Sequence, residues 1–139
     1  MSLKTYHGSC HCGAVQFEAE VDLSAGTTRC NCTFCSKARA WFVFVPAEHL
    51  RLLWGEDAQS EYQWTPIGQS APNLHYRFCR ICGVCTPGVG EHGPDGGPYY
   101  VVPVALLENV DPDELAASIR YVDGRHGQFD QPPDDTRLM

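Results

Sequence analysis

The sequence lacks the features that direct a protein into a membrane or onto nucleic acid. It has no run of about 18 apolar residues, the length that a membrane-spanning helix needs, and no basic segment followed by an apolar one. We therefore expect neither such a helix nor a signal peptide. Its 10 lysines and arginines are scattered and outnumbered by 17 aspartates and glutamates, for a net charge of −7. Because nucleic acid and anionic membranes attract clustered positive charge, we expect neither as a partner.

Helical patterns are scarce as well. The segment 111–115 predicts one short helix, because Asp111 can cap its first turn and Pro112 suits its first position. A single helical turn is expected at 36–40, after a cysteine cluster. A chain with so little helix must build its core from strands.

Strand patterns are frequent. Apolar and polar residues alternate strictly over 15–22, as in a strand with one buried face. The aromatic and β-branched run 41–45 predicts a strand buried on both faces. The glycine-rich segment 88–98 is expected to be a flexible surface loop. Further strand candidates are 50–54, 61–64, 75–79, 99–104 and 119–122.

Many short strands with little helix predict a small all-β sandwich or barrel. The 139 residues fit one domain, 1–139, with a core at about 5–123 and a loosely packed tail at 124–139. Exposed edge strands in such a domain would allow a homodimer.

The eight cysteines fall in four short clusters, and none stands alone. A zinc site needs short-range pairs whose thiolates converge on one ion at about 2.3 Å, whereas disulfide frameworks usually spread their cysteines along the chain. Disulfides or incidental buried thiols are the alternative, but the short spacings and the missing export signal favour metal. We therefore expect a cytoplasmic protein with one or two zinc ions.

Two of the clusters read as zinc knuckles. Cys10-x-Cys12 precedes the first clear strand, Cys79-x-x-Cys82 follows a later one, and each is followed by a glycine that can take a positive φ. Together these four residues predict a closed four-thiolate zinc site. Because a closed site has no free coordination position, its expected role is folding.

The cluster Cys30-x-Cys32-x-x-Cys35 supplies three thiolates within six residues. Three ligands leave a fourth position for water or substrate, which is typical of a catalytic zinc. Such a site suits a soft ligand, so we expect a substrate thiol to bind there, lose its proton and act as a nucleophile. The chemistry that fits is addition of a thiol to a small electrophile, or the reverse elimination.

Cys85 leaves this second site open to another interpretation. As a fourth ligand it would close the site and make it structural, and the chain would then be a zinc-stapled binding or scaffold module without catalysis. It can equally be a small buried hydrophobe. The C-x-x-C-x-x-C spacing of Cys79, Cys82 and Cys85 also admits an iron–sulfur cluster, although the fourth cysteine of that pattern is missing. His75 and His92 are further candidates for ligands or proton carriers.

The order and spacing of these motifs resemble a known family. The segments 8–17, 30–38 and 78–83 carry seven cysteines in the pattern of the glutathione-dependent formaldehyde-activating enzymes, which include the centromere protein V-like proteins. The resemblance covers about Gly8 to Val122. It implies an all-β, β-tent-like fold, and zinc at two sites: a structural one at Cys10, Cys12, Cys79 and Cys82, and a catalytic one at Cys30, Cys32 and Cys35.

The resemblance also implies a reaction. The founding activity of the family is the condensation of formaldehyde with glutathione to S-(hydroxymethyl)glutathione, a carbon–sulfur lyase reaction. We therefore expect a zinc-dependent lyase that acts on a small thiol adduct, with glutathione or a similar thiol as co-substrate.

Overall fold

The computed structural model describes residues 2–139, so Met1 of the predicted domain lies outside the described residues. The predicted all-β class with little helix is confirmed: strands dominate, and the two α-helices have six residues each. The strands are β1 (Lys4–Ser9), β2 (Gln16–Val21), β3 (Thr27–Cys30), β4 (Trp41–Pro46), β5 (Leu50–Trp54), β6 (Gln59–Tyr62), β7 (Leu74–Cys79), β8 (Cys85–Gly90), β9 (Tyr99–Pro103) and β10 (Ile119–Val122), and the helices are α1 (Thr33–Ala38) and α2 (Pro112–Ala117).

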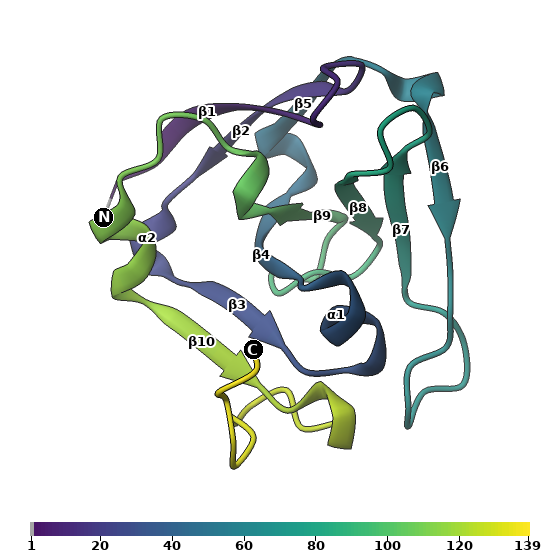
Figure 1. The fold of residues 1–139 in the computed structure, drawn as a ribbon, viewed down its shortest axis with the longest axis vertical. Helices are drawn as coiled ribbons and strands as arrows, with labels where there is room; N and C mark the ends of the chain where they lie inside the picture. The colour runs from purple at the N-terminus through teal and green to yellow at the C-terminus, as the bar shows by residue number, and fades with distance from the viewer. Residues whose placement is uncertain (1) are drawn as a thin grey trace.

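The strands form two sheets (Figure 1). The small sheet has the order β1-β2-β5, and the large one β10-β3-β4-β9-β8-β7-β6. β10 pairs with β3 in parallel, and the other described pairs are antiparallel. The large sheet curves, so that α1 lies between β3 and β4 on one side and β6 and β7 on the other in Figure 1.

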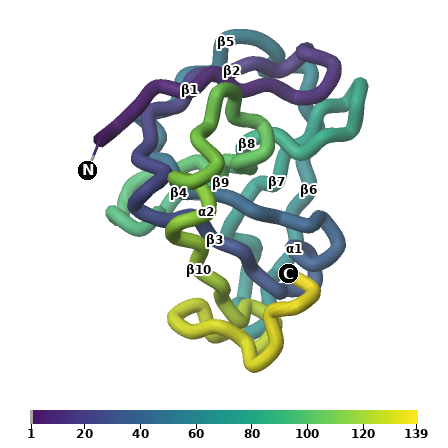
Figure 2. Tube along the Cα trace, turned by 60° about the vertical axis from the view of Figure 1, so that its left-hand side comes forward, coloured from purple at the N-terminus to yellow at the C-terminus, as the bar shows by residue number. Residues whose placement is uncertain are grey.

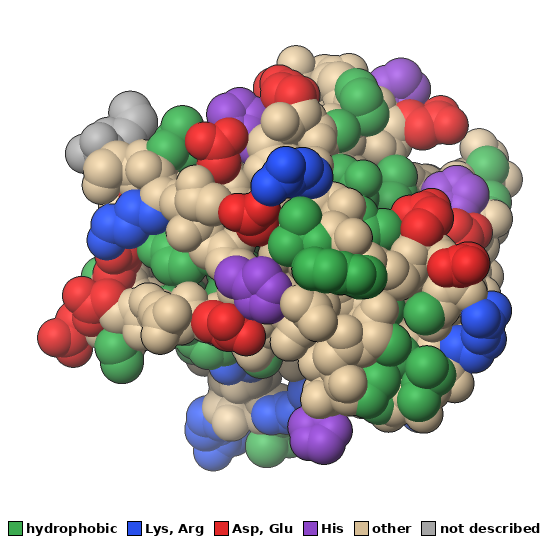
Figure 3. Space-filling model, turned by 90° about the horizontal axis from the view of Figure 1, so that it is seen from above, with side chains coloured by type: hydrophobic (Ala, Val, Ile, Leu, Met, Phe, Trp, Pro, Cys, Tyr) green, Lys and Arg blue, Asp and Glu red, His purple; other side chains and the backbone are tan. Residues whose placement is uncertain are grey.

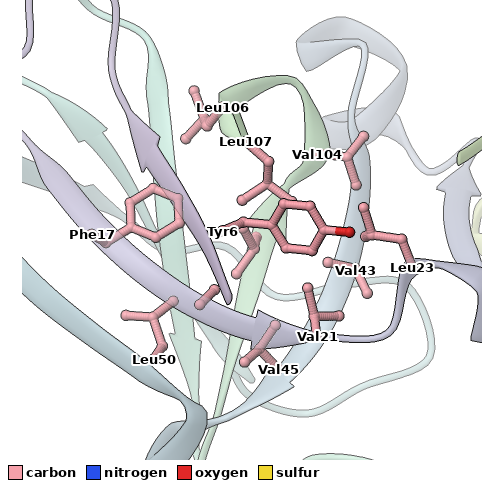
Figure 4. Packing of buried hydrophobic residues seen from close by; sticks show 12 residues of the cluster. Tyr6, Phe17, Val21, Leu23, Val43, Val45, Leu50, Val104, Leu106 and Leu107 are labelled. Carbon is pink, nitrogen blue, oxygen red and sulfur yellow. The ribbon is translucent and has the colours of Figure 1, made fainter. Parts of the chain in front are cut away.

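The main hydrophobic core lies between the two sheets (Figure 4). The alternation in β2 sends Phe17, Ala19 and Val21 into this core, where Phe17 is fully buried. Val43 and Val45 of β4 meet them from the large sheet. Burial of each large apolar side chain contributes about 1.5–3 kcal/mol, so this interface is a main source of stability.

The strand β4 separates two environments. Val43 and Val45 point to the small sheet, whereas the alternate residues Phe42 and Phe44 point to the opposite face, where Phe42 packs on the second cysteine cluster. The prediction of a strand buried on both faces was wrong in part, because Phe42 and Phe44 remain half-buried at the wall of a cavity.

Several predicted elements are confirmed. β5 and β10 have the predicted bounds, β7 and β9 differ by one residue at one end, and β2 is one residue shorter at each end. α2 begins after its predicted cap. The Asp111 side chain accepts a hydrogen bond from the Asp113 amide in that cap.

Other predicted bounds were wrong. The first helix begins at Thr33 rather than at 36, because the Cys32 thiol caps it. β6 ends at Tyr62, so it overlaps only half of the predicted strand 61–64. β1 and β3 were not predicted at all.

The expected surface loop at 88–98 begins as a strand instead. Residues 88–90 form the end of β8, which pairs with β7 and β9. Glycine is required there because a β-carbon at Gly90 would clash with the ring of Tyr99. The composition that suggests a loop therefore reflects close packing of an aromatic ring on a strand.

Within the described residues, no helix is long and apolar enough to cross a membrane. On the face shown in Figure 3, acidic side chains are spread among basic, histidine and apolar ones. The negative charge of the chain is thus dispersed on this face.

Candidate metal centres and active site

The first group of thiols joins the two sheets. Cys10 and Cys12 lie between β1 and β2, and Cys79 and Cys82 lie at the end of β7 and in the turn before β8. Their four Sγ atoms all lie within 4.8 Å of one another. The Sγ atoms of Cys10 and Cys12 are 3.7 Å apart, and those of Cys12 and Cys79 are 3.6 Å apart. Sulfurs at about 2.3 Å from a tetrahedral zinc would be about 3.8 Å apart, so this group fits zinc.

Each knuckle turns back on itself at a glycine. Gly13 and Gly83 have φ values of 81° and 77°, and the Gly83 amide donates a hydrogen bond of 2.8 Å to the Cys79 carbonyl. This turn aims the amides of Ile81 and Cys82 at the Cys79 sulfur. These amides lower the pKa of Cys79, and an N–H from Val84 helps to lower that of Cys82 to about 6. These hydrogen bonds favour the thiolate form of Cys79 and Cys82, whereas the pKa of Cys12 is raised to about 11 in the free thiol group.

The second group lies where β3 runs into α1. The Sγ atoms of Cys30, Cys32 and Cys35 lie within 4.8 Å of one another, and all three residues are buried. The Cys35 amide donates to the Cys32 sulfur at 3.3 Å, and the Cys32 amide donates to the Cys30 sulfur at 3.4 Å. Hydrogen bonds from the Cys30 and Cys35 thiols lower the pKa of Cys32, whereas hydrogen bonds with Cys30 and Cys32 raise the pKa of Cys35. Three converging sulfurs with one favoured thiolate are a donor set that suits zinc.

Cys85 does not belong to either group within that distance. It lies at the start of β8, opposite Phe78 of β7, and its side chain is exposed and lines the cavity described below. Its assignment as a fourth ligand of the second group stays a prediction.

A large cavity of about 1060 Å³ opens beside the second group. Cys30, Cys32 and Cys35 line it together with apolar residues of β4 and β9. None of the described lining residues is acidic, although the chain carries a net charge of −7, and four arginines belong to the lining. These are Arg29, Arg39, Arg77 and Arg120, which come from four different parts of the chain.

The four arginines differ in how they are held. Arg77 pairs with Glu61, and Arg39 donates a hydrogen bond of 2.6 Å to the Leu138 carbonyl. The Arg29 guanidinium lies 4.4 Å from the centre of the Trp41 ring. Arg29 and Arg120 have no ion pair with any residue from 2 to 139. The cavity therefore carries positive charge that no acidic side chain neutralises.

Strand register places Arg120 relative to the thiols. In the parallel pair of β10 and β3, Arg120 lies opposite Thr28 and Val122 lies opposite Cys30. Residues two apart share a face of a strand and lie about 7 Å apart along it. Arg120 is thus on the face that carries Cys30, about 7 Å along the sheet.

An aromatic wall borders the second group. Phe34 of α1 stands between Cys32 and Cys35 in the sequence, and its ring centre is 4.0 Å from that of Tyr76, 5.8 Å from that of Tyr62 and 6.4 Å from that of Trp64. Phe34, Trp64 and Tyr76 line the cavity. This wall supplies apolar surface next to the sulfurs.

The segment after β10 packs on the loop that carries Cys30, Cys32 and Cys35. Figures 1 and 2 show the C-terminal part of the chain next to α1. The Asn31 side chain donates a hydrogen bond of 2.9 Å to Asp123 Oδ1, and Asp123 also accepts from His126 at 2.8 Å. The Arg125 side chain donates to the Asn31 carbonyl and to the Ser36 hydroxyl. The Asn31 hydrogen bond, followed by that of His126, lowers the pKa of Asp123.

Sequence reasoning missed this support. The segment 124–139 was predicted to be a loosely packed tail, and most of it is exposed, but Gly124 is buried and Phe129 lines the cavity. The available indication was the position of Asn31 between Cys30 and Cys32, but its hydrogen-bond partner Asp123 lies 92 residues away. The two candidate histidines lie outside both thiol groups. His75 pairs with Glu61 at 3.2 Å, and His92 lies in the loop after β8.

Two comparisons with known proteins bear on this arrangement. Residues 5–122 match the model of the family described as glutathione-dependent formaldehyde-activating enzyme. A protein of Rhodobacter sphaeroides with a crystal structure is 32% identical to this chain, with a TM-score of 0.65. The match covers 81% of this chain and 97% of that one. Both thiol groups lie within the matched range 5–122.

Proposed function

The chain belongs to the glutathione-dependent formaldehyde-activating enzyme family, and from that premise we propose that it is a zinc-dependent carbon–sulfur lyase acting on a small thiol adduct. The observation that carries this proposal is the placement of three buried thiols at the wall of a large cavity. The other four thiols join two strand ends, and none of them lines that cavity. The two residues directly after Cys82, Gly83 and Val84, reach its wall. One group thus suits a structural role and the other a reactive one.

Cys10, Cys12, Cys79 and Cys82 would hold the structural zinc, and Cys30, Cys32 and Cys35 the second one. A zinc ion held by three thiolates would lower the pKa of a substrate thiol and so provide a nucleophilic sulfur near neutral pH.

The arginines of the cavity would bind and orient the thiol. Glutathione carries two carboxylates, and guanidinium groups recognise carboxylates through paired hydrogen bonds. Arg120 lies on the face of Cys30 and has no ion pair with a described residue, so it is free to take one of these carboxylates. Orientation of the thiol near the reacting carbon is itself a large part of such catalysis.

The reaction balances without an oxidant or reductant. The thiol sulfur forms a bond to the aldehyde carbon, the π electrons of the carbonyl move to its oxygen, and the thiol proton ends on that oxygen by way of solvent. Cleavage of the adduct is the reverse. The apolar and aromatic lining of the cavity would limit the water that competes for the aldehyde.

The test is exchange spectroscopy on an equilibrium mixture of ¹³C-formaldehyde and glutathione. We expect the zinc-loaded protein to raise the exchange rate between free aldehyde and S-(hydroxymethyl)glutathione above the spontaneous rate, and Cys32→Ser to lose that gain. An exchange rate equal to the spontaneous one, in protein with both centres loaded, would exclude this lyase activity and favour a zinc-stapled binding module.

A further inference from the structure

We propose that the Tyr76 hydroxyl, oriented by the Trp64 indole, binds the oxygen of the aldehyde and stabilises the negative charge that develops there as the C–S bond forms. The inference rests on the proposed lyase function and assigns a catalytic residue to it.

Tyr76 is fixed beside the thiols by its ring. The strand β7 carries it, and its ring centre lies 4.0 Å from that of Phe34. Phe34 belongs to the same helical turn as Cys35, and both aromatic residues line the cavity together with Cys32 and Cys35. Because Tyr76 belongs to a strand and its ring packs on Phe34, the ring has a fixed position beside the second thiol group.

The Tyr76 hydroxyl is free to bind a ligand. Its oxygen forms no well-shaped hydrogen bond with residues 2–139. It also keeps some solvent exposure, because the fully buried polar atoms without a partner do not include it. Those atoms belong to His7, His49 and Trp64. The hydroxyl oxygen is therefore not fully enclosed by protein, and the cavity that Tyr76 lines is the space from which a ligand can reach it.

Trp64 explains how the hydroxyl would be oriented. Its Nε1 atom is buried and has no well-formed hydrogen bond within residues 2–139, which is unusual for an indole N–H in a protein interior. It is nevertheless near enough to the Tyr76 oxygen to lower that group's pKa. An N–H that points at the Tyr76 oxygen leaves the phenolic proton to point elsewhere, and the open direction is the cavity.

The surroundings keep this phenol protonated. Burial raises the pKa of Tyr76 most, and the charges of Cys35, Cys32 and Cys30 raise it further. Geometry places the ring near the second group, because it packs on Phe34 of the cysteine loop and lines the same cavity as Cys32 and Cys35. A protonated phenol can donate a hydrogen bond, which is what a carbonyl oxygen needs as it gains charge.

In the forward step the thiol sulfur bonds to the aldehyde carbon and the π electrons move to the oxygen. The Tyr76 O–H donates a hydrogen bond to that oxygen and keeps its own proton, and the oxygen then takes a proton from solvent. In the reverse step the same hydrogen bond stabilises the oxygen as the C–S bond breaks. Tyr76 therefore acts on the charged oxygen in both directions.

The test compares Tyr76→Phe with Tyr62→Phe in the zinc-loaded protein. Both changes remove one hydroxyl from a ring that packs on Phe34, but Tyr62 does not line the cavity. We expect Tyr76→Phe to lower kcat/KM for S-(hydroxymethyl)glutathione about 100-fold, the usual effect of losing one oxyanion donor. Tyr62→Phe should lower it less than about twofold, and both variants should keep their zinc and their Tm.

A binding measurement separates this inference from the proposed activity. Calorimetry would compare S-(2-hydroxyethyl)glutathione with S-ethylglutathione, which lacks the hydroxyl. We expect the wild-type protein to prefer the hydroxylated ligand about fivefold and Tyr76→Phe to lose that preference. An inactive wild type that shows this preference would overturn the lyase proposal, and with it the catalytic role of Tyr76, while supporting Tyr76 as the group that binds the ligand oxygen. Equal preference in wild type and Tyr76→Phe would overturn the role of Tyr76, whatever the activity.

Discussion

Gly124 lies so close to Cys30 that a β-carbon added to it would be 2.5 Å from Cys30 Sγ. The same β-carbon would be 3.3 Å from Cys32 Cβ. The turn after β10 is thus packed directly on the cysteine loop, and the hydrogen bond from Asn31 to Asp123 fastens the two segments beside this contact. The geometry of the second thiol group therefore depends on a segment far along the chain.

Gly124→Ala should damage the second centre selectively. The added methyl group must displace Cys30 or the turn, and errors in such supporting contacts typically cost 10–100-fold in metal affinity. We expect about tenfold weaker zinc binding at one of two centres, measured by competition with a chromogenic chelator. Gly97→Ala is the matched control, because a β-carbon there would meet only Asp95 at 3.9 Å. Two unchanged zinc affinities in Gly124→Ala would contradict the importance of this contact.

Cys82→Ser and Cys32→Ser should separate folding from activity. Loss of a ligand from the first group releases the ends of two sheets, and structural zinc contributes on the order of several kcal/mol to such domains, so we expect Cys82→Ser to unfold or aggregate. Cys32→Ser should keep the fold and lose catalysis. Thermal unfolding followed by circular dichroism gives the answer. An equal fall of Tm in both variants would show that the two centres do not have separate roles.

Arg120→Gln should weaken the binding of an anionic thiol but not of a neutral one. We expect KM for glutathione to rise about three- to tenfold with little change in kcat, since one charge-assisted contact is lost at a partly solvated site. The KM for 2-mercaptoethanol, which has no carboxylate, should stay the same. Arg51→Gln is the control, because Arg51 is exposed and pairs with Glu18 on the small sheet. If KM rose equally for glutathione and for 2-mercaptoethanol, Arg120 would have a structural role.

Cys85→Ser decides between an open and a closed second centre. Cys85 lies outside the group of three sulfurs, so the variant should still bind two zinc ions per chain. Metal analysis after gel filtration measures this directly. Loss of one zinc would instead make Cys85 the fourth ligand and favour the scaffold interpretation.

The two groups of thiols could be predicted from the sequence because the spacings that form them are local. Short spacings such as Cys10-x-Cys12 bring two sulfurs together whatever the rest of the fold does, and the alternation at 15–22 likewise fixes a strand by itself. The helix at Thr33 was placed too late because its cap is a cysteine sulfur, which is not among the usual capping side chains.

The surroundings of the second centre could not be predicted, because they are assembled from distant segments. The cavity arginines come from β3, the end of α1, β7 and β10, and nothing in the order of the chain brings them together. The parallel pairing of β10 with β3 places Arg120 near Cys30, and it depends on contacts between residues about 90 positions apart. Tyr76 of β7 and Trp64, which follows β6, likewise lie beside Phe34 only in the folded chain, and no local pattern indicates that contact.

The most direct test of the account is zinc stoichiometry combined with X-ray absorption at the zinc edge, with and without glutathione. We expect two zinc ions per chain, with mixed sulfur and oxygen ligation that becomes all sulfur when glutathione is added. Ligation that is all sulfur from the start and unchanged by glutathione would contradict it, because the second centre would then have no position at which a substrate thiol could bind.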